Sequence, residues 1–237
     1  GEEAPREAPG VDLARLVAHA RNCLDEGCST VTLFGTTGEG ASLGSGQRAA
    51  MLEAMDDAGV DLRATEHERL MAMKPKGRYN VGLARRHGVT VVEDNTDRGL
   101  DDFVAIRNDT ARRQDLKRRS TRYFADMRRE FGPRAHFFFA ESAGRRLASA
   151  LVIRFAERAT YLYGGSLDEQ RETMAPYLLH HEIMNRMAVT GCTCYDLWGT
   201  APPGQPEHDW AGISAFKRKF GGTDMTHVPT LDHIYDD

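Results

Sequence analysis

The stretches HFFFA at 136–140 and LASALVIRF at 147–155 decide the fold of this chain. Both are apolar and rich in β-branched or aromatic residues, and Ser142-Ala143-Gly144-Arg145 lies between them. A short turn with glycine between two such runs is typical of a β-hairpin. A third strand is predicted at 158–163, so the middle of the chain predicts an antiparallel meander.

The segments on either side of this meander predict helices and two further strands. Downstream, the 3.6-residue apolar period at 175–188 predicts a helix, and 193–197 predicts a strand. Upstream, helices are predicted at 66–73, 81–88, 100–113 and 122–131, with a strand at 89–93. We therefore predict an α+β fold in which helices flank a mixed, mostly antiparallel sheet.

The composition is that of a folded, water-exposed protein. Hydrophobic residues make up 41% of the 237 residues and charged residues 28%, which excludes an intrinsically disordered chain. No apolar run approaches the length of a membrane-spanning helix. Residues 1–10 hold three Glu and two Pro, and we predict that they form a flexible tail. The four cysteines (23, 28, 192 and 194) fit a reducing compartment, and we predict a cytoplasmic protein.

One segment is locally basic although the formal net charge is -4. Residues 107–134 hold ten Lys or Arg against four Asp or Glu. Such a strip is either the solvated face of helices or a patch that binds the phosphates of a nucleotide-linked substrate or of a tRNA. Both interpretations stay open at the level of sequence.

The N-terminal part has a different pattern, with a helix, a strand at 29–34 and the loop Gly-Thr-Thr-Gly-Glu-Gly at 35–40. Residues 11–61 resemble a fragment of the dihydrodipicolinate synthase and N-acetylneuraminate lyase family. That resemblance implies a short, incomplete (β/α)-barrel-like piece in which Thr36 and Thr37 bind a carboxylate. No Schiff-base lysine context follows, so we expect this piece to lack lyase chemistry. A domain boundary is predicted at 62–65.

Several motifs in the rest of the chain resemble the Fem family of peptidoglycan bridge aminoacyltransferases. They are MKPKGRYNVGLARRHGVTVVE at 73–93, YLYGGS at 161–166, YDLWG at 195–199, WAG at 210–212 and FKRKFGG at 216–222. The resemblance spans about 63–237 and implies a GNAT-type domain. It further implies transfer of an amino acid from aminoacyl-tRNA to a stem-peptide amine of a nucleotide- or lipid-linked muropeptide precursor. Neither DNA nor a membrane span is expected, although peripheral contact with the inner membrane face is compatible with such a substrate.

The same resemblance assigns roles to individual residues. Lys217 is the predicted catalytic residue, a point charge for the anion that develops in acyl transfer. The predicted substrate-binding residues are Tyr163, Gly164, Ser166, Asp196, Trp210, Lys76, Arg78 and Asn80.

Each assignment has a purely structural alternative. Lys217 and Lys219 would then lie on the solvated side of a helix. Tyr163 and Ser166 would only close a turn, and Asp196 would accept hydrogen bonds from loop amides, the interpretation that we favour for it. Lys76, Arg78 and Asn80 would only cap the next helix.

We predict neither a cofactor nor a metal. The segment at 163–166 lacks the Gly-rich spacing with which GNAT enzymes hold the coenzyme A pyrophosphate. His180-His181-Glu182 offers no second histidine at i+4, and we interpret it as an exposed helical turn. Two alternatives to an aminoacyltransferase stay open, a keto-acid lyase and a non-catalytic GNAT-like binding module.

Overall fold

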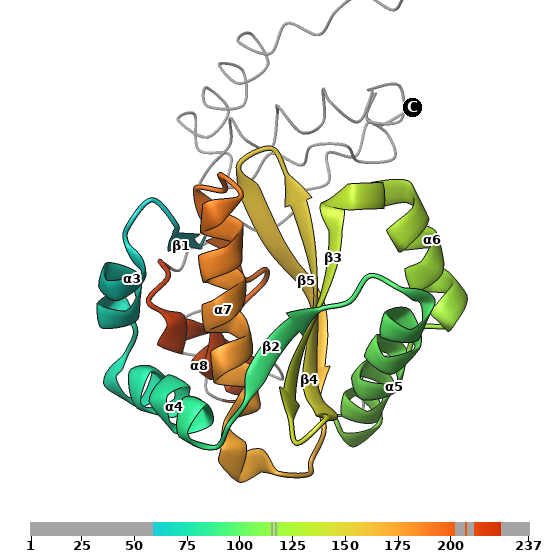
Figure 1. Ribbon diagram of the computed structural model, residues 1–237, viewed down its shortest axis with the longest axis horizontal. Coiled ribbons are helices and arrows are strands. Elements are labelled where there is room, and N and C mark those ends of the chain that lie inside the picture. The colour runs from blue at the N-terminus through green and yellow to red at the C-terminus, as the bar shows by residue number, and fades with distance from the viewer. Residues whose placement is uncertain (1–58, 115, 117, 202–206, 208–210, 224–237) are drawn as a thin grey trace, which may run out of the picture. The chain divides into compact units, whose positions relative to one another are not determined.

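The computed structural model describes residues 59–114, 116, 118–201, 207 and 211–223 (Figure 1). Its strands are β1 (Val60–Asp61), β2 (Thr90–Glu93), β3 (Ala135–Ser142), β4 (Arg145–Phe155), β5 (Arg158–Ser166) and β6 (Cys194–Asp196). Its helices are α3 (Glu66–Ala72), α4 (Pro75–Arg86), α5 (Asp97–Arg113), α6 (Thr121–Phe131), α7 (Ala175–Val189) and α8 (Ala211–Lys217). Short 3-10 turns are η2 (Gly132–Arg134), η3 (Arg171–Thr173) and η4 (Arg218–Phe220).

All six strands form one sheet in the order β1-β6-β5-β4-β3-β2. Every neighbouring pair is antiparallel except β5 and β6, which run parallel. The predicted hairpin between β3 and β4 is present, with Ala143 and Gly144 in the left-handed conformation that its turn requires. The predicted α+β class with a mostly antiparallel sheet is thus confirmed.

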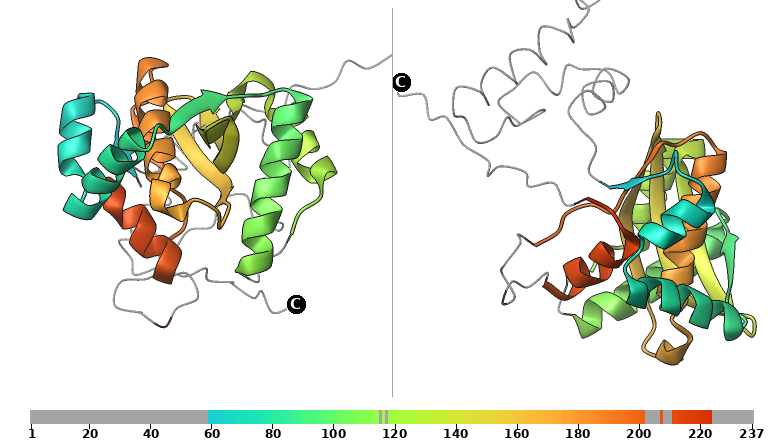
Figure 2. Two further views of the ribbon diagram at one scale, coloured as in Figure 1. Left: turned by 60° about the horizontal axis from the view of Figure 1, so that its bottom comes forward. Right: turned by 90° about the vertical axis from the view of Figure 1, so that its left-hand side faces the viewer.

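Helices cover both faces of this sheet. Figure 1 shows α5 and α6 on one side, and α3, α4 and α7 on the other; the views of Figure 2 agree. The α5 side is an aromatic core that contains Phe103, Phe124 and Phe137. The α7 side buries Leu179, Ile183 and a second set of strand residues.

Local sequence explains where these helices begin. Thr65 and Glu68 form a reciprocal capping box at the start of α3, and the Thr96 hydroxyl accepts the N–H of Gly99 at the start of α5. Pro75 occupies the first position of α4, where a missing N–H costs nothing. The helix therefore starts earlier than the predicted residue 81 and includes Lys76, Arg78 and Asn80.

The first strand lies at the predicted domain boundary. Val60 pairs with Tyr195 and Asp61 with Cys194, so the sheet includes residues just before 63. The tail at 1–10, most of the barrel-like fragment at 11–62, and Thr36 and Thr37 lie outside the described residues.

The parallel pair β5 and β6 is short. Its register joins Arg158 to Cys194 and ends with Thr160 opposite Asp196, whereas β5 continues to Ser166. Beyond that last pair the two strands separate. The end of β5, the segment after β6 and the helices next to them hold the residues of the candidate site.

Candidate functional site

Lys217 lies at the end of α8, close to the segment that follows β6. Its Nζ donates a hydrogen bond of 2.7 Å to the carbonyl oxygen of Gly199, and the residue is only 8% exposed. Burial lowers the pKa of Lys217 to about 8, and the charge of Asp196 opposes that shift. Lys217 is therefore not on a solvated helix face.

The segment at 197–201 is fixed by side chains on both sides. The Asp196 carboxylate accepts the Trp198 N–H at 2.7 Å, which is the loop-amide role favoured from sequence. The Ala201 N–H donates to the Ser214 hydroxyl at 2.7 Å, so α8 holds the other end. Trp198 has a φ of 64°, a left-handed conformation that is unusual for a bulky residue. The carbonyl that Lys217 contacts is thus rigidly placed.

His180 and His181 of α7 are buried, so the predicted exposed turn is wrong. His180 is 3% exposed and His181 0%, because α7 packs on the sheet with one face and on α3 and α4 with another. His180 Nδ1 lies 2.8 Å from the Tyr195 hydroxyl, and its ring packs edge-on against Tyr161. Burial, aided by the charge of Lys217, lowers the pKa of His180 to about 3. The ring is therefore neutral at physiological pH.

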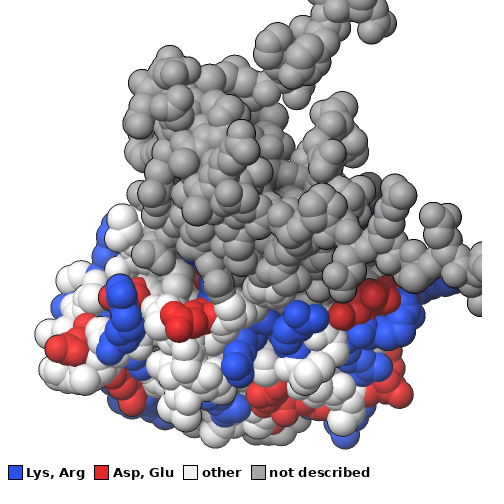
Figure 3. All heavy atoms as spheres, turned by 90° about the horizontal axis from the view of Figure 1, so that it is seen from above, with Lys and Arg blue, Asp and Glu red and all other residues white. Residues whose placement is uncertain are grey.

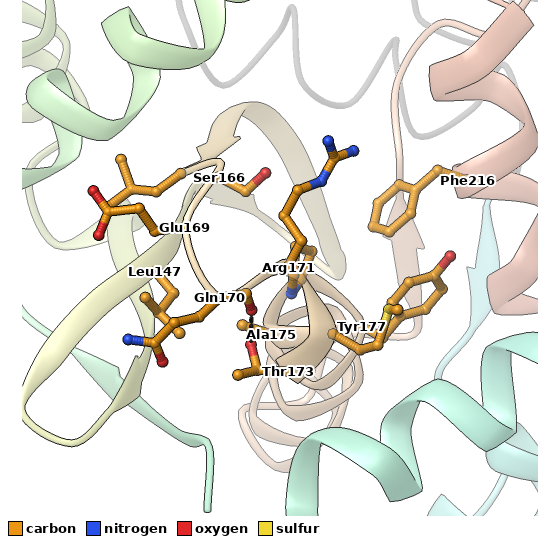
Figure 4. Close-up of a pocket in the computed structure, with 12 residues that line it drawn as sticks. Leu147, Ser166, Glu169, Gln170, Arg171, Thr173, Ala175, Tyr177 and Phe216 are labelled. Atoms are coloured by element: carbon orange, nitrogen blue, oxygen red, sulfur yellow. Dashed lines mark hydrogen bonds between the residues drawn. The ribbon is translucent and has the colours of Figure 1, made fainter. Parts of the chain in front are cut away.

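A cavity of about 270 Å³ opens where β5 leads into α7. Figure 4 shows Tyr177 and Phe216 along one side, Ser166 and Glu169 on the opposite side, and Arg171 between them. Its walls are mostly apolar. The Tyr177 hydroxyl accepts a hydrogen bond from Lys219 Nζ at 2.9 Å, so Lys219 also has a partner within the protein. The cavity therefore borders α8, which ends at Lys217, and lies close to η4, which carries Lys219.

A second cluster joins the other face of β5 to α5 and α6. The hydroxyls of Tyr163 and Tyr123 lie 3.0 Å apart, and the Arg119 guanidinium lies 4.9 Å from the Tyr123 ring. Arg107 lies 5.9 Å from the Tyr163 ring, and its buried NH1 has no hydrogen-bond partner in the described part of the chain. A buried guanidinium N–H without a partner is costly, and an anionic ligand would satisfy it.

Sequence reasoning did not single out Arg107 or Arg119, although both lie in the basic strip at 107–134. The structure sorts that strip by ion pairing. Arg112 and Arg113 contact Asp109, and Arg122 and Arg129 contact Asp126. Figure 3 likewise shows Lys and Arg side chains interspersed with Asp and Glu on the face that it draws. Most of the strip is a solvated, ion-paired helix surface.

The remaining predicted residues fall in three places. Ser166 exchanges backbone hydrogen bonds of 2.9 Å with the Thr110 hydroxyl, and a Cβ at Gly164 would collide with the Tyr161 hydroxyl. On α4, Lys76 is exposed, Arg78 donates to the Met71 and Met73 carbonyls, and Asn80 is buried. Trp210 lies outside the described residues. Asp196 and Lys217 are the predicted pair that the structure brings together.

Comparison with known proteins identifies the family. A family model described as an acetyltransferase (GNAT) domain matches residues 76–218, more than half of the chain. This chain belongs to the GNAT domain family. It is 30% identical over 115 residues to the UDP-N-acetylmuramoylpentapeptide-lysine N(6)-alanyltransferase of Weissella viridescens, covering 48% of this chain and 34% of the relative. It is also 30% identical over 95 residues to the lipid II:glycine glycyltransferase of Staphylococcus epidermidis, covering 40% and 23%.

A solved structure agrees with this GNAT assignment. The crystal structure of FemX superposes with a TM-score of 0.66 at 18% identity, over 70% of this chain and 58% of that one. The matched part of this chain spans about a third or less of the length of the two curated relatives. The GNAT-type domain and the similarity to Fem proteins that the motifs predicted are both confirmed.

The family description implies acetyl coenzyme A, and the start of α7 is the place to test its fit. A pyrophosphate there needs several free backbone N–H groups. Thr173, Met174 and Tyr177 already donate theirs to carbonyl oxygens of the same turn, and Pro176 has none. Among residues 173–177 at most the Ala175 N–H is left, so the start of α7 does not offer the group of amides that a coenzyme A pyrophosphate needs.

Two further properties bear on the site. Within the described residues, no group of three His, Cys, Asp or Glu side chains could hold a metal ion. The described helices include none that is long and apolar enough to cross a bilayer.

Proposed function

We propose that this GNAT domain takes part in aminoacyl transfer from aminoacyl-tRNA to a stem-peptide amine of a peptidoglycan precursor. The relatives named above support the acceptor class, and aminoacyl-tRNA is the donor that the Fem resemblance implies. The proposal includes a cytoplasmic location, where both substrates would be met, and a GNAT-type domain at 63–237 after a tail at 1–10 and a fragment at 11–62.

The observation that carries the proposal is the buried ammonium group of Lys217. In the reaction, an amine attacks the ester carbonyl, a C–N bond forms and the C–O bond to the terminal ribose breaks. The carbonyl oxygen gains negative charge on the way. An ammonium donates three hydrogen bonds, and within the described residues Gly199 accepts one of them, which leaves two for the developing oxyanion.

The protonation state of Lys217 suits this role. With its pKa at about 8, the group is roughly nine-tenths protonated at pH 7, and partial burial strengthens its field. Overall, one proton moves from the attacking amine to the departing ribose oxygen. A group that titrates near neutrality can supply that proton and then recover it from the amine.

The cluster of Arg107 and Arg119 supports an anionic substrate. Two guanidinium groups over the rings of two tyrosines, whose hydroxyls lie 3.0 Å apart, suit a phosphate or carboxylate oxygen. A nucleotide-linked muropeptide carries both kinds of group. Because the formal charge of -4 gives the chain no general attraction for anions, such a substrate needs a local basic site.

The test is a transfer assay with aminoacyl-tRNA and a uridine-diphosphate-linked pentapeptide, on the wild type and on Lys217→Met. We expect kcat to fall about 10²- to 10³-fold, the usual effect of removing one oxyanion donor. Arg98→Met is the control, because Arg98 is 84% exposed on α5. Unchanged turnover in Lys217→Met would refute the role of the lysine. Precursor binding by a folded wild type that transfers nothing would favour the non-catalytic binding module.

A further inference from the structure

The helix α4 carries cations and no acidic residue. Residues 74–88 include five Lys or Arg and no Asp or Glu. The structure gives two of the five a partner: Arg78 donates to the Met71 and Met73 carbonyls, and Arg85 pairs with Glu66 and Glu182. The other three, Lys74, Lys76 and Arg86, are exposed. No ion pair joins these three to any residue that the structure describes.

An exposed aromatic ring lies among these cations. Tyr79 is 61% exposed, and the Arg86 guanidinium lies 5.7 Å from the centre of its ring. An exposed ring beside an arginine offers a face on which a nucleobase can stack, while the lysines contact phosphates. We call Lys74, Lys76, Tyr79 and Arg86 the basic corner. Lys74 and Arg86 are about 18 Å apart along the helix axis, which is long enough for several nucleotides.

The basic corner adjoins η4, the turn that directly follows the candidate catalytic residue Lys217. The Lys74 N–H donates to the Lys219 carbonyl oxygen at 3.1 Å, and a Cβ at Gly77 would lie only 2.7 Å from that oxygen. Glycine therefore allows α4 to approach η4 closely. Lys219 in turn donates to Tyr177, which lines the cavity. In Figure 2 the red segment that holds α8 and η4 lies next to α4, and η4 makes the contact.

We propose that the basic corner docks the phosphodiester backbone of the RNA donor next to its 3′ end. This inference rests on the proposed aminoacyl transfer, because that reaction gives the chain an RNA substrate. Charge complementarity points to a polyanion, and the single exposed tyrosine among the cations suits an unpaired strand. A lipid surface is the less suitable partner, because the large apolar side chains exposed at this corner are only Met71 and Tyr79 within the described residues.

The experiment measures RNA binding directly, without turnover. A fluorescein-labelled, deacylated RNA hairpin with a four-nucleotide unpaired 3′ end is titrated by anisotropy between 50 and 200 mM KCl. The test variant combines Lys74→Gln, Lys76→Gln and Arg86→Gln. Lys74 is the N-cap residue of α4 but makes no side-chain capping bond, so helix formation should be unaffected. Circular dichroism and Tm confirm that each variant is folded.

The control variant removes the same net charge elsewhere. It combines Arg98→Gln, Arg122→Gln and Arg129→Gln, whose side chains are 84%, 91% and 68% exposed. We expect the basic-corner variant to bind at least tenfold more weakly than the control. Its slope of log K against log salt should be smaller by about 2, since each lost phosphate contact removes roughly 0.7 to 0.9.

Each outcome decides between distinct conclusions. Equal weakening of both variants would show that net charge alone attracts RNA, and would overturn the inference while leaving the transfer reaction intact. RNA binding that is unchanged in the basic-corner variant would also overturn the inference and leave the transfer reaction intact. A wild type that ignores RNA but binds vesicles with 30% phosphatidylglycerol through this corner would replace RNA by a membrane. A wild type that binds no RNA and transfers nothing would overturn the proposed function itself.

Discussion

The two faces of the sheet bury different kinds of side chain. On the α5 face, Phe103 packs edge-on against Phe124 and Phe137, with ring centres 5.0 and 5.1 Å apart. On the α7 face, His180 and Lys217 are buried among apolar residues instead. Both faces belong to the same strands. The difference between the two cores therefore comes largely from the side chains of the helices that cover each face.

The contrast separates the aromatic core around Phe103, which stabilises the fold, from the buried ionisable groups His180 and Lys217, which can take part in chemistry. An aromatic core gains free energy from burial and ring contacts without any desolvation cost. Buried ionisable groups cost stability, and groups with displaced pKa values gather at functional sites. Changes to the buried rings of the α5 face should therefore affect stability alone, whereas changes to the buried ionisable groups of the α7 face should also alter pH dependence.

The largest effect is expected on the α5 face. Phe103→Ala removes a ring that is 0% exposed and in contact with two other rings, and should lower the free energy of unfolding by about 3–5 kcal/mol. Urea denaturation measures it. Tyr123→Phe is the control in the same layer, because it keeps the ring and should cost about 1 kcal/mol or less. A cost below about 2 kcal/mol for Phe103→Ala would mean that this face is not the main source of stability.

A smaller, pH-dependent effect is expected on the α7 face. The unfolded chain protonates His180 near pH 6.5, whereas the folded chain does so only near 3, because burial lowers the pKa of His180 to about 3. The stability that this residue contributes is therefore complete above pH 6.5 and falls as the pH drops toward 3. Between pH 7 and 5 the loss should be about 2 kcal/mol. His180→Gln keeps a hydrogen-bonding atom for Tyr195 but does not titrate. Between pH 7 and 5, its free energy of unfolding should therefore fall by about 2 kcal/mol less than that of the wild type.

A carboxylate beside the α5 face gives the matched control. The pKa of Asp94 is lowered to about 2, mainly by hydrogen bonds from Thr96 and Arg146. Its contribution is complete above pH 4 and falls only as the pH drops toward 2. Asp94→Asn should therefore leave the loss between pH 7 and 5 unchanged. If Asp94→Asn changed the loss of unfolding free energy between pH 7 and 5 as much as His180→Gln does, the pH dependence would not be specific to the α7 face.

Sequence patterns predicted the strands and helices of the fold, but not which polar residues of a helix are buried. The apolar runs on either side of residues 142–145 predicted the hairpin, since strand composition and turn residues are local signals. The burial of His180 and His181 was not predictable in this way. Periodicity assigns one apolar face to a helix, whereas α7 is covered on several sides by elements distant in the sequence.

The candidate site was predictable only where a motif pointed to it. The motif at 216–222 identified Lys217, but its bond to Gly199 depends on where β6 and α8 meet. Within the strip at 107–134, composition could not separate Arg107 and Arg119 from their ion-paired neighbours. That separation depends on the tertiary contacts by which Tyr163 of β5 meets Arg107 and Tyr123.

The smallest effect concerns backbone strain beside the cavity. Gln170 precedes η3 and has a φ of 51°, and Ala156, in the turn between β4 and β5, has a φ of 47°. Both side chains are exposed, so replacement by glycine removes little packing. Gln170→Gly and Ala156→Gly should each raise the free energy of unfolding by about 0.5–1 kcal/mol, because glycine adopts this conformation without a Cβ clash. Thermal unfolding measures both. A gain in stability for Ala156→Gly but not for Gln170→Gly would contradict this expectation at Gln170. It would mean that the Gln170 side chain makes stabilising contacts in the cavity wall, which offset the cost of its left-handed conformation before η3 and α7.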